Sequence, residues 1–178
     1  MSEVYHIEQF SPSKDDKFFL DTNIWMYLYC SIGNYNQSVV EKYNVFFEKI
    51  LNSNAKIYTT AMQISEFFNT YCKLEYHIAK QTHPELNYKR DFRASEDFID
   101  LVSNLRMIIK HRIFKHAEKI DDKFSNIKID EVLKNSSYDF NDEYFINLCL
   151  QDSIIIVSND RDMMSHPSGI KIVSNLKQ

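Results

Sequence analysis

Apolar and polar positions along the chain predict short buried strands separated by amphipathic helices. Four apolar runs predict strands, at residues 17–20, 56–59, 153–157 and 171–173. Apolar residues spaced three and four apart predict helices, at residues 23–31, 36–54, 61–80, 92–117 and 140–151. Because strands and helices take turns along the chain, the pattern predicts a mostly parallel sheet with helices on both faces.

Other segments carry weaker patterns. Residues 1–16 predict a short arm, and residues 118–138 are polar and irregular, with a short helix near 129–134. Thr60 and Gln63 have the spacing of a capping box, in which each side chain bonds to the backbone N–H of the other. We therefore expect the helix that follows to begin at residue 61.

The composition is that of a single helix-rich globular domain spanning residues 1–178. The chain has 44% apolar and 26% charged residues, and only 2 glycines and 3 prolines, fewer than sandwiches and barrels usually need. It has no apolar run long enough to cross a membrane, and its acidic, polar start differs from a signal peptide. Three widely spaced cysteines fit reduced thiols in a cytoplasm and match no zinc pattern.

The net charge of −4 argues against a protein that only grips nucleic acid, because such proteins are usually basic. An acidic chain is still compatible with a nuclease, since carboxylates that hold metal ions add negative charge that the metals offset.

Carboxylates follow two of the predicted strands at the point where each strand ends. Asp21 comes directly after the first apolar run, whereas Asp160 and Asp162 follow the run that ends at residue 157. Sites in parallel sheets gather just beyond the carboxyl ends of the strands, so these acids should meet at one edge. Asn23 fits either a helix cap or a neighbour of this site.

Two more acids lie on predicted helices. At 100° per residue, Asp142 shares the inward face with Phe145 and Cys149, while Glu143 points away. For Asp142 alone, a favourable interaction with the helix dipole is an equally good explanation, and Asp139 fits an N-cap. Glu66 lies roughly opposite the apolar stripe of its helix. Considered by itself, it is expected to be a solvated helix residue.

Three segments in this order resemble a PIN domain: FLDTNIW, TTAMQISEFFN and NDEYFINLCLQDSIIIVSNDRDM. The resemblance covers about half of the chain, and residues 76–138 correspond to a helical variable insert. It implies an α/β/α sandwich with a central, mostly parallel sheet. Its metal-binding and catalytic residues would be Asp21, Glu66, Asp142 and Asp160, with Asp162 as an optional fifth acid and Asn23 and Ser158 as supporting neighbours.

The resemblance implies a Mg²⁺- or Mn²⁺-dependent ribonuclease that cleaves phosphodiester bonds in RNA. Carboxylates brought together repel one another unless a cation sits among them, and oxygen ligands select hard cations. Such cations activate water and stabilise the leaving oxygen of a phosphodiester. Small bacterial PIN proteins are commonly toxins of toxin–antitoxin pairs, so an antitoxin and a homodimer are expected partners. A catalytically inactive scaffold and a metal-dependent DNA nuclease remain open alternatives.

The most basic segment is IKHRIFKHAEK. Three of its basic residues are spaced by four on the predicted helix, and a fourth is adjacent, so they share one side. This side is a candidate RNA-binding surface, although cations near a helix C-terminus also interact favourably with its dipole. The four residues are His111, Arg112, Lys115 and Lys119.

Overall fold

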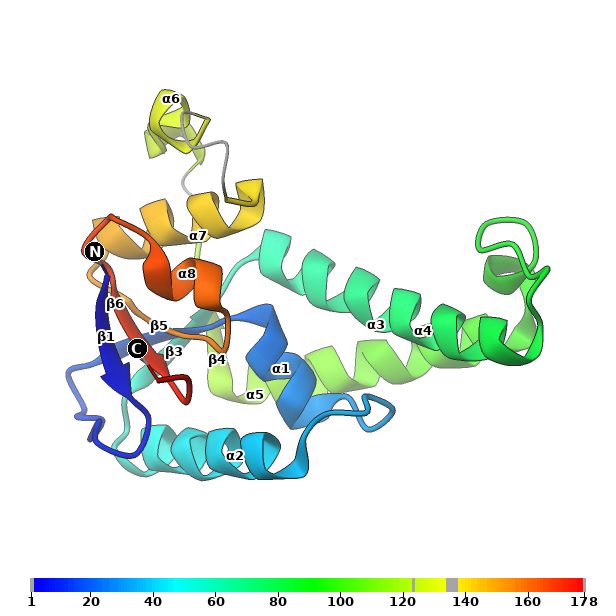
Figure 1. The fold of residues 1–178 in the computed structure, drawn as a ribbon, viewed down its shortest axis with the longest axis horizontal. Coiled ribbons are helices and arrows are strands. Elements are labelled where there is room, and N and C mark those ends of the chain that lie inside the picture. Colours follow the sequence, from blue (N-terminus) through cyan, green and yellow to red (C-terminus); the bar gives the residue numbers. More distant parts are fainter. Residues whose placement is uncertain (1, 123, 134–137, 178) are drawn as a thin grey trace.

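The computed structural model describes residues 2–122, 124–133 and 138–177. Its centre is one six-stranded sheet in the order β1-β6-β5-β2-β3-β4, in which every pairing is parallel (Figure 1). The strands are β1 (Glu3–His6), β2 (Lys17–Leu20), β3 (Lys56–Thr59), β4 (Ala117–Lys119), β5 (Ile155–Val157) and β6 (Lys171–Ser174). The predicted parallel α/β architecture is confirmed.

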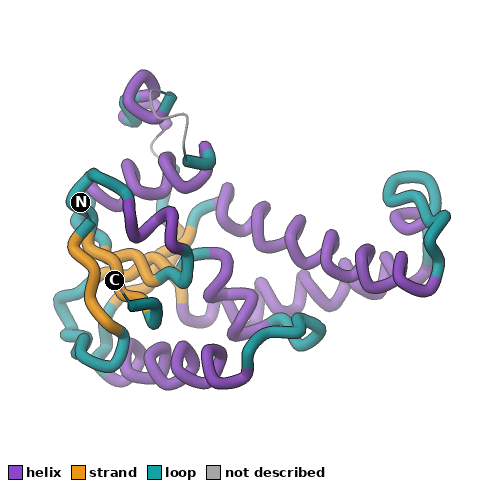
Figure 2. Tube along the Cα trace, viewed as in Figure 1, coloured by secondary structure: helices purple, strands orange, loops and turns teal. Residues whose placement is uncertain are grey.

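Helices connect the strands and cover the sheet (Figure 2). The main helices are α1 (Thr22–Tyr29), α2 (Gln37–Asn52), α3 (Ala61–Thr82), α4 (Glu96–Ile108) and α7 (Phe140–Gln151). The short ones are a 3₁₀ turn at Phe92–Ala94, a π-helical turn at Ile109–Ile113, α5 (Phe114–His116), a 3₁₀ turn at Phe124–Asn126, α6 (Ile129–Val132) and α8 (Arg161–Ser165). None of the described helices has the length and apolar character needed to cross a membrane.

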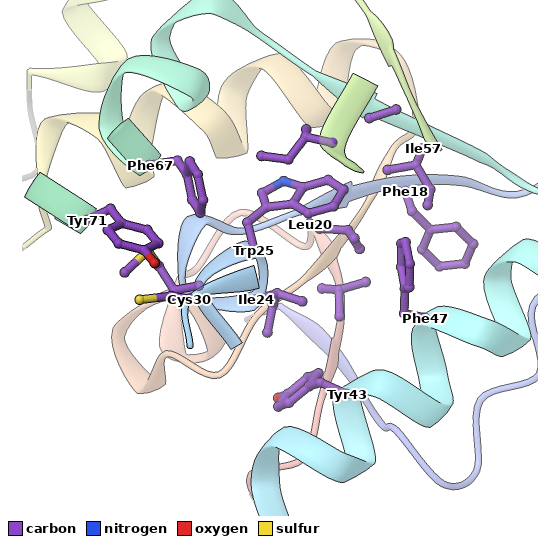
Figure 3. Packing of buried hydrophobic residues seen from close by; sticks show 14 of the residues in the cluster. Phe18, Leu20, Ile24, Trp25, Cys30, Tyr43, Phe47, Ile57, Phe67 and Tyr71 are labelled. Carbon is purple, nitrogen blue, oxygen red and sulfur yellow. The ribbon is translucent and has the colours of Figure 1, made fainter. Parts of the chain in front are cut away.

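The sheet separates two apolar clusters, as expected where successive strand residues point to opposite faces. Phe18 and Leu20 of β2 join the first cluster with residues of α1, α2, α3 and α4, whereas Phe19 between them joins the second. The first cluster centres on Trp25, whose side chain is fully buried (Figure 3). The second contains Phe145 of α7 and Met163 of α8. The result is a three-layer α/β/α sandwich.

Several predicted boundaries agree with the structure, and others do not. The predicted strands at 17–20 and 56–59 and the helix at 140–151 match β2, β3 and α7. Residues 1–16 were expected to form a short arm, and no strand was predicted there, but they contain β1, which pairs with β6 and forms one edge of the sheet. The short helix α8 at Arg161–Ser165 was not predicted. The short helix near 129–134 corresponds to α6, and residue 134 lies outside the described residues.

The single long helix predicted at 92–117 is wrong. Helix α4 begins at Glu96, the backbone widens into a π-helical turn at Ile109–Ile113, and the chain leaves the helix at Ala117 to form β4. One extra residue in a π turn shifts the register of everything that follows it. Because the chain has left the helix by Ala117, Lys119 lies on β4, with its Nζ 5.3 Å from the centre of the Phe114 ring. The predicted spacing of four through Lys119 does not exist.

Glu143 is also not where the helical wheel places it. Its side chain was expected to point away from the core, but it is 3% exposed and its Oε1 lies 2.9 Å from Nε2 of His166. The backbone carbonyl of His166 accepts hydrogen bonds from Ser2 N and Oγ, both at 2.8 Å. The segment after α8 thus covers the outer side of α7, which leaves helix α7 buried on more than one face.

Candidate functional site

The strand order changes direction between β2 and β5. From β2 the chain continues to β3 and β4 on one side, and then crosses to β5 and β6 on the other. Beyond such a point the connections diverge and leave a crevice, where ligands of open α/β sheets bind. Asp21 follows β2 at this point, and its backbone N donates to the carbonyl of Val157 at the end of β5 over 2.9 Å.

Asp21 is held by two side-chain donors. Ser158 Oγ and Asn23 Nδ2 each donate to its Oδ2 over 2.6 Å, and only 7% of Asp21 is exposed. Asn23 lies inside α1 rather than at its N-cap, so its interaction with Asp21 replaces the helix-cap explanation. Both residues that were expected to support the site therefore touch its first carboxylate.

Ser158 also connects Asp21 to Asp160. The backbone N of Asp160 donates to Ser158 Oγ over 3.0 Å. Asp160 is the N-cap of α8, and its Oδ1 accepts a hydrogen bond from Asp162 N over 2.7 Å. A single hydroxyl thus ties together the polypeptide segments that leave β2 and β5.

Asp142 and Glu66 come from two further helices. Asp142 lies in the first turn of α7, after the N-cap Asp139, whose Oδ1 accepts from Asn141 N over 2.8 Å. Asn141 Nδ2 lies 3.4 Å from Glu66 Oε2 and so links α7 to α3. Considered by itself in the sequence, Glu66 was expected to be a solvated residue, but its side chain is half-buried and lines the same cavity as the other acids.

The orientation of α3 depends on Gln63, which is fully buried. Thr60 Oγ1 accepts from Gln63 N over 3.2 Å, as the capping-box pattern predicts. The reciprocal half of the box is absent, because Gln63 Nε2 donates to the carbonyl of Leu20 over 2.6 Å and its Oε1 accepts from Thr59 Oγ1 over 2.7 Å. The amide therefore fixes the start of α3 against the ends of β2 and β3.

The acidic side chains described above line one cavity of about 490 Å³. Its described lining contains six carboxylates and no lysine, arginine or histidine. The six acids are Asp21, Glu66, Asp139, Asp142, Asp160 and Asp162. The sequence-based set of five acids is thus brought together, and Asp139 is an additional member. Tyr27, Tyr35 and Asn141 also line the cavity and were missed. Tyr27 could have been found from the sequence, because it follows Asn23 by four residues and so lies on the same face of the helix.

The carboxylates disfavour one another's ionisation. Burial raises the pKa of Asp21 to about 6, and the negative charge of Asp160 adds to this effect. Burial followed by the charge of Asp21 raises the pKa of Glu66 to about 7. Burial, Asp21 and Asp160, in that order, raise the pKa of Asp142 to about 7. Perturbed acids that share a cavity are typical of functional sites.

The donor set fits a hard divalent cation, because every polar group in the described lining presents oxygen or an amide, and no basic residue among them balances the acids. Within the described part of the chain, no three acidic, imidazole or thiol side chains already stand close enough together to hold a metal ion. The acids surround the cavity rather than converge on one point.

The basic residues predicted to bind RNA do not form one surface with this cavity. His111, Arg112, Lys115 and Lys119 are all absent from its lining, and they are divided among the π-helical turn, α5 and β4. Arg112 instead lines a neighbouring cavity.

Comparisons with known proteins agree with this architecture. The family model described as PIN domain matches residues 18–168, a span that contains all the acids of the cavity. A search of curated proteins gives no match. The solved structure of VapBC2 from Rickettsia felis, bound to a DNA fragment from its promoter, is similar with a TM-score of 0.52 and 16% identity. That similarity covers 89% of this chain and 98% of the other, and at this identity it concerns the fold alone. The chain belongs to the PIN domain family.

Proposed function

We propose that this protein is an endoribonuclease that depends on Mg²⁺ or Mn²⁺. The observation that carries the proposal is the cavity at the switch point of the sheet, which six carboxylates line without a basic lining residue among those described. Burying acids in this way is costly unless a cation compensates them. The cation ligands in this proposal are Asp21, Glu66, Asp142 and Asp160, with Asp162 as an optional fifth.

The side chains have separable roles in this proposal. When bound, a divalent cation supplies Lewis-acid stabilisation of a phosphodiester and lowers the pKa of water. Ser158 and Asn23 fix the direction of the Asp21 carboxylate, because both donate to the same carboxylate oxygen, Oδ2. Asn141 restrains Glu66 in a similar way from α7.

Cleavage assays on single-stranded RNA and DNA of the same sequence test the proposal. We expect the RNA to be cleaved in Mn²⁺ or Mg²⁺ and to survive in a chelator. The isosteric double variant Asp21→Asn/Asp142→Asn should lose cleavage and keep its circular dichroism spectrum. Asp100→Asn on the exposed side of α4 is the matched control. Full cleavage by the double variant would refute the proposed site, and preferential cleavage of DNA would replace RNA as the substrate.

Mn²⁺ titration calorimetry distinguishes an enzyme from an inactive scaffold on the same fold. Wild-type protein should bind Mn²⁺, and the double variant should not. A wild-type protein that binds no Mn²⁺ would favour the scaffold alternative, since nothing else in the described lining offsets the acids.

We further propose that the protein is the cytoplasmic toxin of a toxin–antitoxin pair, with an antitoxin that places a basic side chain in the acidic cavity. Membership of the PIN family and the fold likeness to VapBC2 support this role. Expression of the wild-type chain should arrest growth, whereas the double variant should not. Co-expression of the neighbouring reading frame should restore growth. Unimpaired growth with abundant wild-type protein would contradict the toxin role.

A further inference from the structure

A second cavity, of about 520 Å³, adjoins the carboxylate cavity. The two cavities share Tyr27 and Tyr35 as lining residues, so the two rings form a wall between them. The rings meet edge to face, with centroids 5.0 Å apart. Tyr29 adds a third tyrosine to the lining of the second cavity, and Arg112 lines it as well. We call this space the tyrosine cavity.

The two cavities have opposite electrostatic character. The carboxylate cavity has six acids in its described lining, whereas the described lining of the tyrosine cavity contains no acid, and Arg112 is its one charged residue. Arg112 is exposed, and no ion pair involving it occurs among the described residues. Its guanidinium is therefore available to an anionic ligand that reaches both cavities.

Two features set the positions of the two rings. Gly33 permits the position of Tyr35, because a Cβ on Gly33 would occupy the space of the Tyr35 ring. The Tyr27 hydroxyl accepts a hydrogen bond from Asn159 Nδ2 over 3.1 Å, and Asn159 immediately precedes Asp160. The aromatic surface is thus built at a fixed position relative to the acids.

We infer that the tyrosine cavity is a nucleotide subsite, in which a base next to the cleaved bond packs against Tyr35 and Tyr27 while Arg112 binds a backbone phosphate. The inference rests on the proposed nuclease function. Proteins that bind single strands combine aromatic platforms with cationic groups along the backbone. Here the two features occur together on one side of an acid-lined cavity, and a chain of alternating phosphates and bases matches that arrangement.

The test measures cleavage kinetics with a single-stranded RNA of about twelve nucleotides, a length within the range that such grooves bind. Tyr35→Leu and Arg112→Ala should each raise KM roughly tenfold, as expected when one stacked base or one phosphate contact is lost. Gly33→Ala should raise KM as well, because the added methyl group displaces the Tyr35 ring. Tyr5→Leu on β1 and Arg106→Ala on α4 are matched controls, since both residues are exposed and line neither cavity.

Substrates that lack single bases give a sharper result. In the wild-type enzyme, an abasic nucleotide at one position beside the cut should raise KM by the same factor as Tyr35→Leu. In the Tyr35→Leu variant the same abasic substrate should cause no further loss, because the ring and the base are the two partners of one contact. Additive effects of the two changes would overturn the subsite.

Failure of this inference is distinguishable from failure of the proposed function. If the wild-type protein binds Mn²⁺ and cleaves RNA while Tyr35→Leu and Arg112→Ala keep the wild-type KM, the subsite is wrong and the nuclease stands. The subsite is also wrong if these variants keep KM but lose binding to a partner protein, since the cavity would then receive a peptide. If the wild-type protein neither binds Mn²⁺ nor cleaves RNA, both proposals fail.

Discussion

Asp139 and Asp142 lie three residues apart at the start of α7, and both line the carboxylate cavity. Their environments differ. Asp139 is exposed and caps the helix through Asn141 N, whereas Asp142 is half-buried and has a pKa raised to about 7 by burial and by the neighbouring acids. Spacing and helical geometry could predict Asp142 from the sequence because they are local. The presence of Asp139 in the cavity could not be predicted, since it depends on how α7 sits against α3.

This difference predicts unequal effects of two identical substitutions. Asp142→Asn should reduce cleavage at least about 100-fold, because loss of a metal ligand costs more than loss of an outer-shell partner. Asp139→Asn should leave cleavage within about twofold, since asparagine caps helices as well as aspartate does. Initial rates at saturating Mn²⁺ measure both. Equal losses in the two variants would contradict the assignment of Asp142 as the ligand.

The raised pKa values of Asp21, Glu66 and Asp142 predict an unusual pH dependence of the metal-free protein. Between about pH 4 and pH 7 the unfolded chain has ionised these acids while the folded chain still holds their protons. The folded state then binds more protons, so the free energy of unfolding contributed by these groups falls as pH rises through this range. Thermal unfolding in a chelator should show this fall, with a shallower slope in Asp142→Asn.

Mn²⁺ should reverse this trend, because a cation binds the ionised acids and stabilises the folded state by mass action. The Tm gain caused by Mn²⁺ should therefore grow from pH 5 to about pH 8. A Tm gain that is independent of pH would show that the cation binds elsewhere. The double variant Asp21→Asn/Asp142→Asn should show no gain and serves as the control.

At the scale of elements, a helix or strand could be predicted when the residues that determine it are its own. It could not be predicted when it depends on contacts with residues far away in the chain. Strand β2 and helix α7 carry their own apolar patterns, and their predicted bounds match the structure. Strands β1 and β4 are four and three residues long, lie at the edges of the sheet and form only through pairing with distant residues. The π-helical turn at Ile109–Ile113 leaves no periodic signal, because it is a single extra residue within a helical pattern.

Gln63 decides how α3 meets the sheet and where Glu66 points. Gln63→Leu leaves the carbonyl of Leu20 and the hydroxyl of Thr59 without their buried partner, so the free energy of unfolding should fall by about 1–3 kcal/mol. Chemical denaturation measures the change, with Gln81→Leu on the exposed end of the same helix as the control. Mn²⁺ affinity should fall as well, since α3 carries Glu66. An unchanged Mn²⁺ affinity would show that the position of Glu66 does not depend on the hydrogen bonds of Gln63.

At the scale of the whole molecule, residues 76–138 contribute more than a surface insertion. Helices α3 and α4 extend side by side away from the sheet (Figure 1). The same segment supplies β4, which pairs with β3, and it supplies Leu105 and Ile113 to the first apolar cluster. No motif marks this segment, because these contacts join residues far apart in the chain.

The far end of the α3–α4 hairpin should be dispensable, whereas its base should not. Replacing residues 84–95 with a short Gly–Ser loop removes Tyr88 and Phe92, which pack on Tyr76 with ring centroids 5.1 and 5.6 Å away. We expect unfolding to become easier by about 2–4 kcal/mol, the usual cost of losing a large buried side chain. Mn²⁺ binding should persist, because no residue of the replaced loop lines the carboxylate cavity.

Deleting all of 76–138 should abolish folding, since it removes β4 and uncovers β3. A soluble, Mn²⁺-binding product of that larger deletion, seen by calorimetry and circular dichroism, would show that the whole segment is an independent addition.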